Sequence, residues 1–124
     1  MKIYIIDDDH LSTFLTMNML SLEDATHDIS TFLIAADALE ALQEVHEDNV
    51  PELMFVDLNM PVMDGWDFLN ALAPMAHRLR ERCSIYVLTS SLDVSDTLRL
   101  KDYPFVAGLI QKPIRSEDIH IVAC

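Results

Sequence analysis

Four short apolar runs in this chain each end in polar residues of types that take part in metal and phosphoryl chemistry. Asp57 shows the pattern most clearly, because it follows the apolar residues 53–56 and precedes a loop marked by Pro61 and Gly65. Its carboxylate is therefore expected at the exit of a buried strand, where a ligand can reach it. The other groups are Asp7 and Asp8 after residues 3–6, Thr89 after residues 85–88, and Lys112 after residues 106–111.

If the fold brings these groups together, they suit phosphoryl transfer to an aspartate. The carboxylates of Asp7, Asp8 and Asp57 would repel one another unless a cation lay among them. Hard oxygen ligands favour Mg²⁺, with Mn²⁺ as an alternative, and Mg²⁺ is commonly shared with a phosphate. An aspartate can itself be the nucleophile and form an acyl phosphate. The ammonium group of Lys112 and the hydroxyl group of Thr89 would then neutralise and position the phosphoryl oxygens.

Taken singly, each of these residues also has an ordinary structural explanation. Asp7 and Asp8 could be solvated residues near the start of a helix, and Asp9 is expected to cap that helix rather than bind a ligand. Thr89 could simply end a strand, and Lys112 could be a surface lysine at a turn. Their joint placement after four apolar runs favours a shared site over these separate explanations.

The hydrophobic pattern predicts the elements that would position these residues. Five apolar runs are predicted to be strands: residues 3–6, 29–34, 53–56, 85–88 and 106–111. The segments between them have helical spacing. The first helix carries an apolar stripe, the pattern typical of a buried helix face, made of Leu11, Phe14, Leu15, Met19 and Leu22.

Three further features mark helix ends and packing. Asp37 followed by Glu40 predicts a capping box for the second helix. Pro74 is expected to end or kink the third helix. Trp66 and Phe68 could form a partner surface, although one of them is expected to pack under that helix. Shorter helices are predicted at residues 94–101 and from residue 116 onward.

Alternating strands and helices predict one α/β domain over residues 1–124, with a parallel sheet covered on both faces. Right-handed crossovers place the carboxyl ends of all the strands at one edge of the sheet. In open sheets of this kind that edge holds the ligand site, where the strand order reverses. The residues expected to meet there are Asp7, Asp8, Asp57, Thr89 and Lys112.

Composition narrows the function classes. The net charge of −13 argues against unaided binding to nucleic acid or to an anionic membrane. The chain has no apolar run long enough to span a bilayer and no signal-like N-terminus, so a cytoplasmic protein is expected. Cys83 and Cys124 stand in no motif and are expected to be free thiols.

The order and spacing of these motifs resemble the receiver domain of two-component response regulators, the CheY-like family, over essentially the whole chain. The matching motifs are Asp7-Asp8, the run from Asp57 to Gly65 (DLNMPVMDG), Thr89-Ser90 and Lys112-Pro113. The resemblance implies a flavodoxin-like doubly wound (βα)5 domain with the strand order 2-1-3-4-5. That order is carried over from the family and is not worked out from the pattern.

The resemblance also implies roles at the acidic residues. Asp57 would accept a phosphoryl group from a phosphohistidine on a sensor histidine kinase or a histidine phosphotransfer protein. Mg²⁺ would be bound by the side chains of Asp8 and Asp57, by the backbone carbonyl of Asn59, and by Asp7 through water.

Further roles follow from the same resemblance. Lys112 would contact the phosphoryl oxygens from a cis peptide bond to Pro113, and Thr89 would swing toward the phosphoryl group on activation. Asn59 and Ser91 occupy positions that tune the rate of dephosphorylation, and both are small and polar here.

The chain departs from the family pattern in two places. Leu109 stands three residues before Lys112, where the family usually carries the tyrosine or phenylalanine that accompanies the threonine switch. Tyr86, Tyr103 and Phe105 are the aromatic residues that could take part in a variant of it. The last helix is also brief, which leaves open whether that side of the domain is an output or dimer surface.

The predicted function is that of a phosphoacceptor in a phosphorelay. It would be phosphorylated on Asp57, bind an unidentified protein target and hydrolyse its own acyl phosphate, without turning over an external substrate. If the chain is complete, it leaves no room for an output domain. One alternative is a phosphate-independent pseudo-receiver. Another is a Mg²⁺-dependent phosphatase of the haloacid dehalogenase type, which needs a second acid where Asn59 stands.

Overall fold

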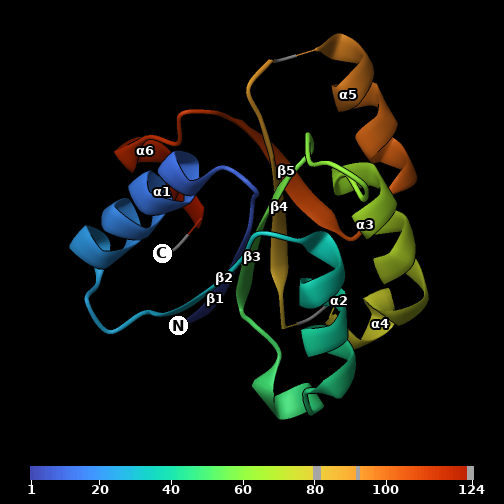
Figure 1. The fold of residues 1–124 in the computed structure, drawn as a ribbon, viewed down its shortest axis with the longest axis horizontal. Coiled ribbons are helices and arrows are strands. Elements are labelled where there is room, and N and C mark those ends of the chain that lie inside the picture. The colour runs from blue at the N-terminus through green and yellow to red at the C-terminus, as the bar shows by residue number, and fades with distance from the viewer. Residues whose placement is uncertain (80–81, 92, 123–124) are drawn as a thin grey trace.

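A five-stranded parallel sheet forms the centre of the structure, a computed structural model that describes residues 1–79, 82–91 and 93–122 and, within these, all side chains but that of residue 47 (Figure 1). The strand order is β2-β1-β3-β4-β5, which confirms the flavodoxin-like topology implied by the sequence. The strands are β1 (Lys2–Ile6), β2 (Asp28–Phe32), β3 (Leu53–Asp57), β4 (Ser84–Thr89) and β5 (Val106–Gln111).

Helices cover both faces of this sheet. The helices α1 (His10–Glu23) and α6 (Ser116–Val122) lie on one face, and α2 (Ala35–Glu44), α3 (Gly65–Leu72) and α5 (Val94–Arg99) lie on the other (Figure 1). The short helix α4 (Ala76–Leu79) and three single 3₁₀ turns complete the order: Glu47–Asn49, Ala73–Met75 and Leu100–Asp102. None of the helices in the described ranges has the length and apolar character needed to cross a bilayer.

The central strand β3 divides the core into two layers. All five of its residues are buried, because it lies between β1 and β4 and has helices on both faces. Successive side chains point to opposite faces of a strand. Phe55 accordingly packs on the side of α1 and α6, whereas Met54 and Val56 pack on the side of α2 and α3.

The helix ends agree with the sequence in two places and differ in one. Asp9 caps α1 by accepting a hydrogen bond from the backbone N–H of Leu11 at 3.0 Å, as predicted. The helix containing Trp66 ends at Leu72, and the chain continues as a 3₁₀ turn that contains Pro74. The capping box predicted at Asp37 is wrong, since α2 begins at Ala35 with Asp37 already in its first turn. The second strand likewise ends at Phe32 rather than at residue 34.

Most of the apolar stripe predicted on the first helix lies on its exposed face, although Met19 is half-buried and packs against the core. The fractional exposures are 65% for Leu11, 59% for Phe14, 40% for Leu15 and 87% for Leu22. The residues of α1 that face the sheet are Thr13, Thr16 and Leu20, and the hydroxyl group of Thr16 donates to the carbonyl oxygen of Ser12. Helical spacing shows which residues share a face of a helix, but α1 is apolar on more than one face, so the pattern alone does not reveal which face is buried.

The start of α3 is packed tightly against the end of β3. A Cβ atom added at Gly65 would lie 2.6 Å from the carbonyl oxygen of Asp57 and 2.7 Å from the Cα atom of Leu58. Backbone atoms at these positions cannot move aside without moving the strand end. Trp66 and Phe68, which follow in α3, are both buried, so the alternative that they form a partner surface is not supported.

Gly65→Ala is therefore expected to reduce the free energy of unfolding by about 1–3 kcal/mol, measured by urea denaturation. Gly108→Ala is the matched control, because the added Cβ would meet the ring of Tyr86, a side chain, at 3.3 Å. We expect that control to stay within about 0.5 kcal/mol of the wild type. Equal losses in the two variants would contradict the close approach at Gly65.

Candidate functional site

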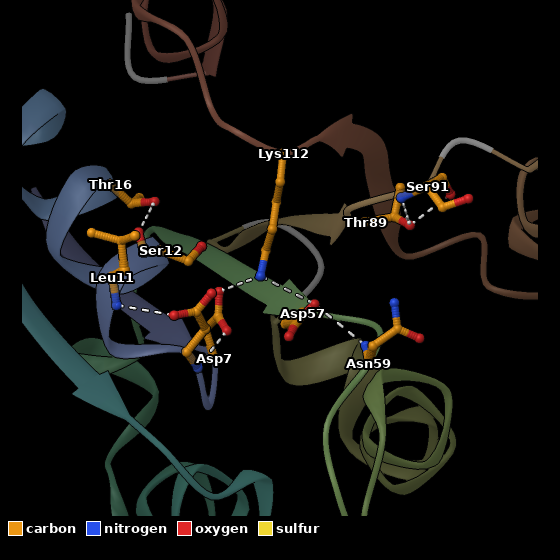
Figure 2. A network of polar contacts seen from close by, with 10 residues as sticks. Asp7, Leu11, Ser12, Thr16, Asp57, Asn59, Thr89, Ser91 and Lys112 are labelled. Carbon is orange, nitrogen blue, oxygen red and sulfur yellow. Dashed lines mark hydrogen bonds and ion pairs between the residues drawn. The ribbon is translucent and has the colours of Figure 1, made fainter.

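The residues singled out in the sequence lie at the carboxyl edge of the sheet (Figure 2). Asp7 directly follows β1, Asp57 is the last residue of β3, Thr89 is the last residue of β4, and Lys112 directly follows β5. Backbone hydrogen bonds continue past the strand ends and hold them in register. The N–H of Asp7 donates to Phe32, that of Leu58 to Leu88, and that of Lys112 to Thr89, at 2.7 to 3.0 Å.

The three carboxylates form a compact acidic cluster. One oxygen from each of Asp7, Asp8 and Asp57 lies within 4.8 Å of the others. Asp7 and Asp57 are almost fully buried, whereas Asp8 is partly exposed. The backbone N–H of Asp9 donates to Asp7 Oδ1 at 3.0 Å, which orients that carboxylate. The donor set is all oxygen and strongly anionic, so these residues fit a hard divalent cation such as Mg²⁺.

Lys112 is the one cation of the described residues that contacts this cluster. Its Nζ lies 2.7 Å from Asp7 Oδ2 and 3.4 Å from Asp57 Oδ1, so it reaches between the two carboxylates (Figure 2). Burial by itself would lower the pKa of Lys112. The hydrogen bond to Asp7 and the charges of Asp7 and Asp57 together outweigh burial, so the pKa is raised and the ammonium form is favoured. The peptide bond from Lys112 to Pro113 is cis, as predicted.

The surroundings of Asp57 in this cluster raise the pKa of its carboxyl group. Burial and the neighbouring charge of Asp7 raise its pKa to about 6, against the lowering effects of Lys112 and of the backbone N–H of Asn59. That N–H donates to Asp57 Oδ1 at 3.3 Å. The carboxylate is therefore poorly compensated by Lys112 alone, and a cation beside it would favour the ionised form that a nucleophile needs.

Thr89 faces its own loop. Its hydroxyl group donates to the carbonyl oxygen of Ser91 at 2.8 Å and accepts from the N–H of Ser91 at 3.2 Å, which turns it away from Asp57 (Figure 2). Thr89 and Ser91 thus belong to one local turn. A move of the Thr89 hydroxyl toward a group on Asp57 would break both of these hydrogen bonds.

Leu109 occupies the position where the family resemblance implies an aromatic ring. It is half-buried and packs against the core layer on the side of α2 and α3. Tyr86 packs against the opposite layer, near Phe55, and so lies on the other face of the sheet from Thr89 and its neighbour Val87. Tyr86 is thereby removed from the aromatic candidates. Tyr103 and Phe105 remain, on the same side as Leu109.

The sequence did not reveal a pocket of about 290 Å³ beside Lys112. Its walls include Leu11 and Leu15 of α1, together with Ser90 and Pro113 from the loops that follow β4 and β5. The pocket opens next to the acidic cluster and is formed partly by the exposed face of α1. The apolar spacing in α1 was the only sequence signal for it, and that signal was the one typical of a buried face.

The raised pKa of Asp57 predicts how the stability of the fold depends on pH. Its folded pKa of about 6 exceeds its ordinary value of 3.8, so the folded state holds the proton more tightly. In metal-free protein this group should lower the free energy of unfolding as pH rises from about 4 to 6, and that loss persists above pH 6. Added Mg²⁺ should raise the melting temperature by a few degrees at pH 7 and by less at pH 5, where protons compete with it.

Calorimetry of the wild type and of Asp57→Asn, with and without Mg²⁺, tests this prediction. The variant lacks the titrating carboxylate, so its stability should lose this part of the pH dependence. It should also gain less stability from Mg²⁺. An unchanged pH profile in Asp57→Asn would show that another group is responsible.

Solved structures of the same fold include several response regulators. The chain is similar to a two-component response regulator from Cytophaga hutchinsonii, with 21% identity and a TM-score of 0.90 over 98% of this chain and 92% of that one. It is also similar to a response regulator receiver protein from Dyadobacter fermentans (22% identity, TM-score 0.83, 98% and 97% covered). Chemotaxis protein CheY4 of Vibrio cholerae matches as well (24% identity, TM-score 0.76, 98% and 94% covered).

At these identities the solved structures establish the fold alone. A comparison with curated protein sequences found no match. The family model described as the response regulator receiver domain matches residues 3–123. Since this match spans almost the whole chain, which also has the strand order and the acidic cluster expected of the family, the chain belongs to the response regulator receiver domain family.

Proposed function

We propose that this chain is a phosphoacceptor that is phosphorylated on Asp57 in a Mg²⁺-dependent reaction with a phosphohistidine protein. The observation that carries the proposal is the position of Asp57, which belongs to an acidic cluster suited to a divalent cation and also lies 3.4 Å from the ammonium group of Lys112. Mg²⁺ bound at Asp8, Asp57 and the backbone carbonyl of Asn59, and through water at Asp7, would neutralise charge on the phosphoryl oxygens.

The chain's own residues supply the remaining steps. The carboxylate oxygen of Asp57 attacks phosphorus, and the P–N bond to the donor imidazole breaks with its electron pair going to the ring nitrogen. Lys112 moves from Asp7 and Asp57 to the new phosphoryl oxygens, and the Thr89 hydroxyl donates to another of them. Hydrolysis reverses the modification when water attacks phosphorus and the P–O bond to Asp57 breaks.

Two alternatives have less support. A phosphatase of the haloacid dehalogenase type needs a general acid two residues after the nucleophile, and the amide side chain of Asn59 cannot serve as one. We therefore propose no turnover of an external substrate. A phosphate-independent pseudo-receiver would not need a buried carboxyl group at Asp57, whose burial beside Asp7 raises its pKa and costs stability.

The most direct test combines the protein with acetyl phosphate and Mg²⁺ and measures the intact mass. We expect a gain of about 80 Da, the mass of one phosphoryl group, that requires Mg²⁺ and is lost in Asp57→Asn. Asp64→Asn is a matched control, since that aspartate is not part of the acidic cluster and its side chain caps α3 by accepting from the backbone N–H of Asp67. A wild type that never gains the adduct would contradict the proposal.

The donor would reach Asp57 across the exposed face of α1. Leu11 and Leu15 on that face line the pocket that borders Lys112, and Phe14 is exposed on the same helix, so an apolar surface continues to the edge of the acceptor site. A helical protein that carries the phosphohistidine can bury these side chains as it presents its imidazole to Asp57. We place this sensor kinase or phosphotransfer protein in the cytoplasm with the chain.

Phe14→Glu should lower the rate of transfer from a phosphorylated histidine kinase by about tenfold, because it places a charge in the docking surface. The donor is the kinase, taken from a panel of autophosphorylated sensor kinases, that phosphorylates the wild type. Phosphorylation by acetyl phosphate should stay unchanged, since that donor needs no protein contact. Leu98→Glu, an exposed leucine on α5, is the control and should leave both rates unchanged. Equal rates from the kinase for Phe14→Glu and the wild type would exclude this docking surface.

A further inference from the structure

The helix α5 has few attachments to the rest of the domain. None of its six residues is buried, and its apolar residues Val94 and Leu98 are exposed. An amphipathic helix of a globular domain usually buries one face, so packing of its own side chains does not hold α5 in place. Its position depends on the residues at its C-terminal end and on the loop that joins its N-terminal end to Thr89.

The C-terminal end of α5 is attached to α3. The guanidinium carbon of Arg99 lies 4.4 Å from the centre of the Trp66 ring, a cation–π contact. Just beyond α5, the hydroxyl group of Tyr103 donates to Asn70 Oδ1 at 2.8 Å, and its ring lies 5.6 Å from that of Trp66. We call this set of Trp66, Asn70, Arg99 and Tyr103 the α3–α5 latch.

The α3 side of the latch is fixed to the acceptor strand. Trp66 follows Gly65, whose N–H donates to the carbonyl oxygen of Leu58 at 3.0 Å and whose Cα has no room for a side chain against Asp57. Trp66 itself is buried. The ring that Arg99 covers is therefore held in a fixed position relative to the end of β3.

The N-terminal side of α5 is attached to the threonine of the site. Asp93, the N-cap of α5, comes four residues after Thr89, and the hydroxyl group of Thr89 makes two hydrogen bonds with Ser91, two residues before that cap. If Thr89 leaves Ser91 to reach a phosphoryl group on Asp57, both of these hydrogen bonds break and Ser91 is released next to the start of α5. The helix then moves relative to the fixed ring of Trp66.

We propose that the α3–α5 latch couples the position of α5 to the state of Asp57, a role for which Leu109 offers no aromatic ring. Arg99 covers Trp66 in the unphosphorylated state, and phosphorylation releases this contact, so α5 and its exposed leucine change position. The inference rests on the proposed phosphorylation of Asp57. It assigns the coupling to α3 and α5, because Leu109 offers no ring and Tyr86 lies on the opposite face of the sheet.

The size of the effect follows from the kind of contact. A cation–π contact at an exposed site shifts a two-state equilibrium by a factor of about 2 to 5. Coupling is reciprocal, so a contact that opposes the phosphorylated conformation must also weaken the binding of a phosphoryl analogue. Removing the contact should strengthen that binding by the same factor.

Trp66 is the only tryptophan of the chain, so its fluorescence reports on the latch without engineering. Phosphorylation of the wild type by acetyl phosphate and Mg²⁺ should shift its emission to longer wavelength, as water reaches the uncovered ring. Hydrogen exchange in residues 94–99 should rise by about 2- to 5-fold, since the helix opens more often. Arg99→Ala should show both changes before phosphorylation and little further change after it.

Lys101→Ala is the matched control, because it removes the same charge from an exposed position in the turn after α5. It should respond like the wild type. Arg99→Ala should bind beryllofluoride with Mg²⁺ about 2- to 5-fold more tightly than the wild type and Lys101→Ala do. Equal affinities in Arg99→Ala and the wild type, or an equal emission response, would overturn the latch.

The intact mass separates this inference from the function on which it rests. A complete phosphoryl adduct with unchanged Trp66 emission would overturn the latch and leave the phosphoacceptor function standing. Absence of the adduct would overturn both.

Discussion

Repulsion among buried carboxylates at one edge of the sheet is the constraint on which the rest of this structure depends. Asp7 and Asp57 are both nearly excluded from water, and Lys112 is shared between them. Burial and the charge of Asp7 raise the pKa of Asp57 even though Lys112 lowers it, so one ammonium group does not compensate the buried carboxylates. Added positive charge would therefore stabilise the site. A phosphoryl group would bring further negative charge, which a cation and Lys112 would together have to neutralise.

Holding such a site costs stability, so the surrounding fold must fix it firmly. Asp57 ends the one strand that is buried along its whole length, with a packed layer on either side. Gly65 lets α3 approach the same strand end closely enough for backbone contact. Functional sites are often locally unfavourable in this way, and the packing of the surrounding fold offsets the stability that they cost.

The sequence predicted those parts of the molecule that repeat a simple rule. Apolar runs gave the five strands, and the rule that parallel strands end at one edge brought Asp7, Asp57, Thr89 and Lys112 together. It did not predict which face of α1 is buried, since that depends on how the helix packs over β1 and not on its spacing. The same holds for the contact between Arg99 and Trp66, which joins residues from separate helices. Contacts between residues of separate helices produce no repeating pattern in a single sequence, so they could not be predicted from it.

The arrangement of the helices separates where a signal would enter the domain from where it would leave. The exposed apolar face of α1 lies on one side of the sheet, and α5 lies on the other (Figure 1). A protein bound at α1 would therefore leave α5 uncovered, so phosphorylation and its readout need not compete for one surface. The strands connect the two sides, because Thr89 and Asp57 end neighbouring strands of the sheet. A short movement at their shared edge can reach α5 without any rearrangement of the core, whose close packing resists gradual deformation.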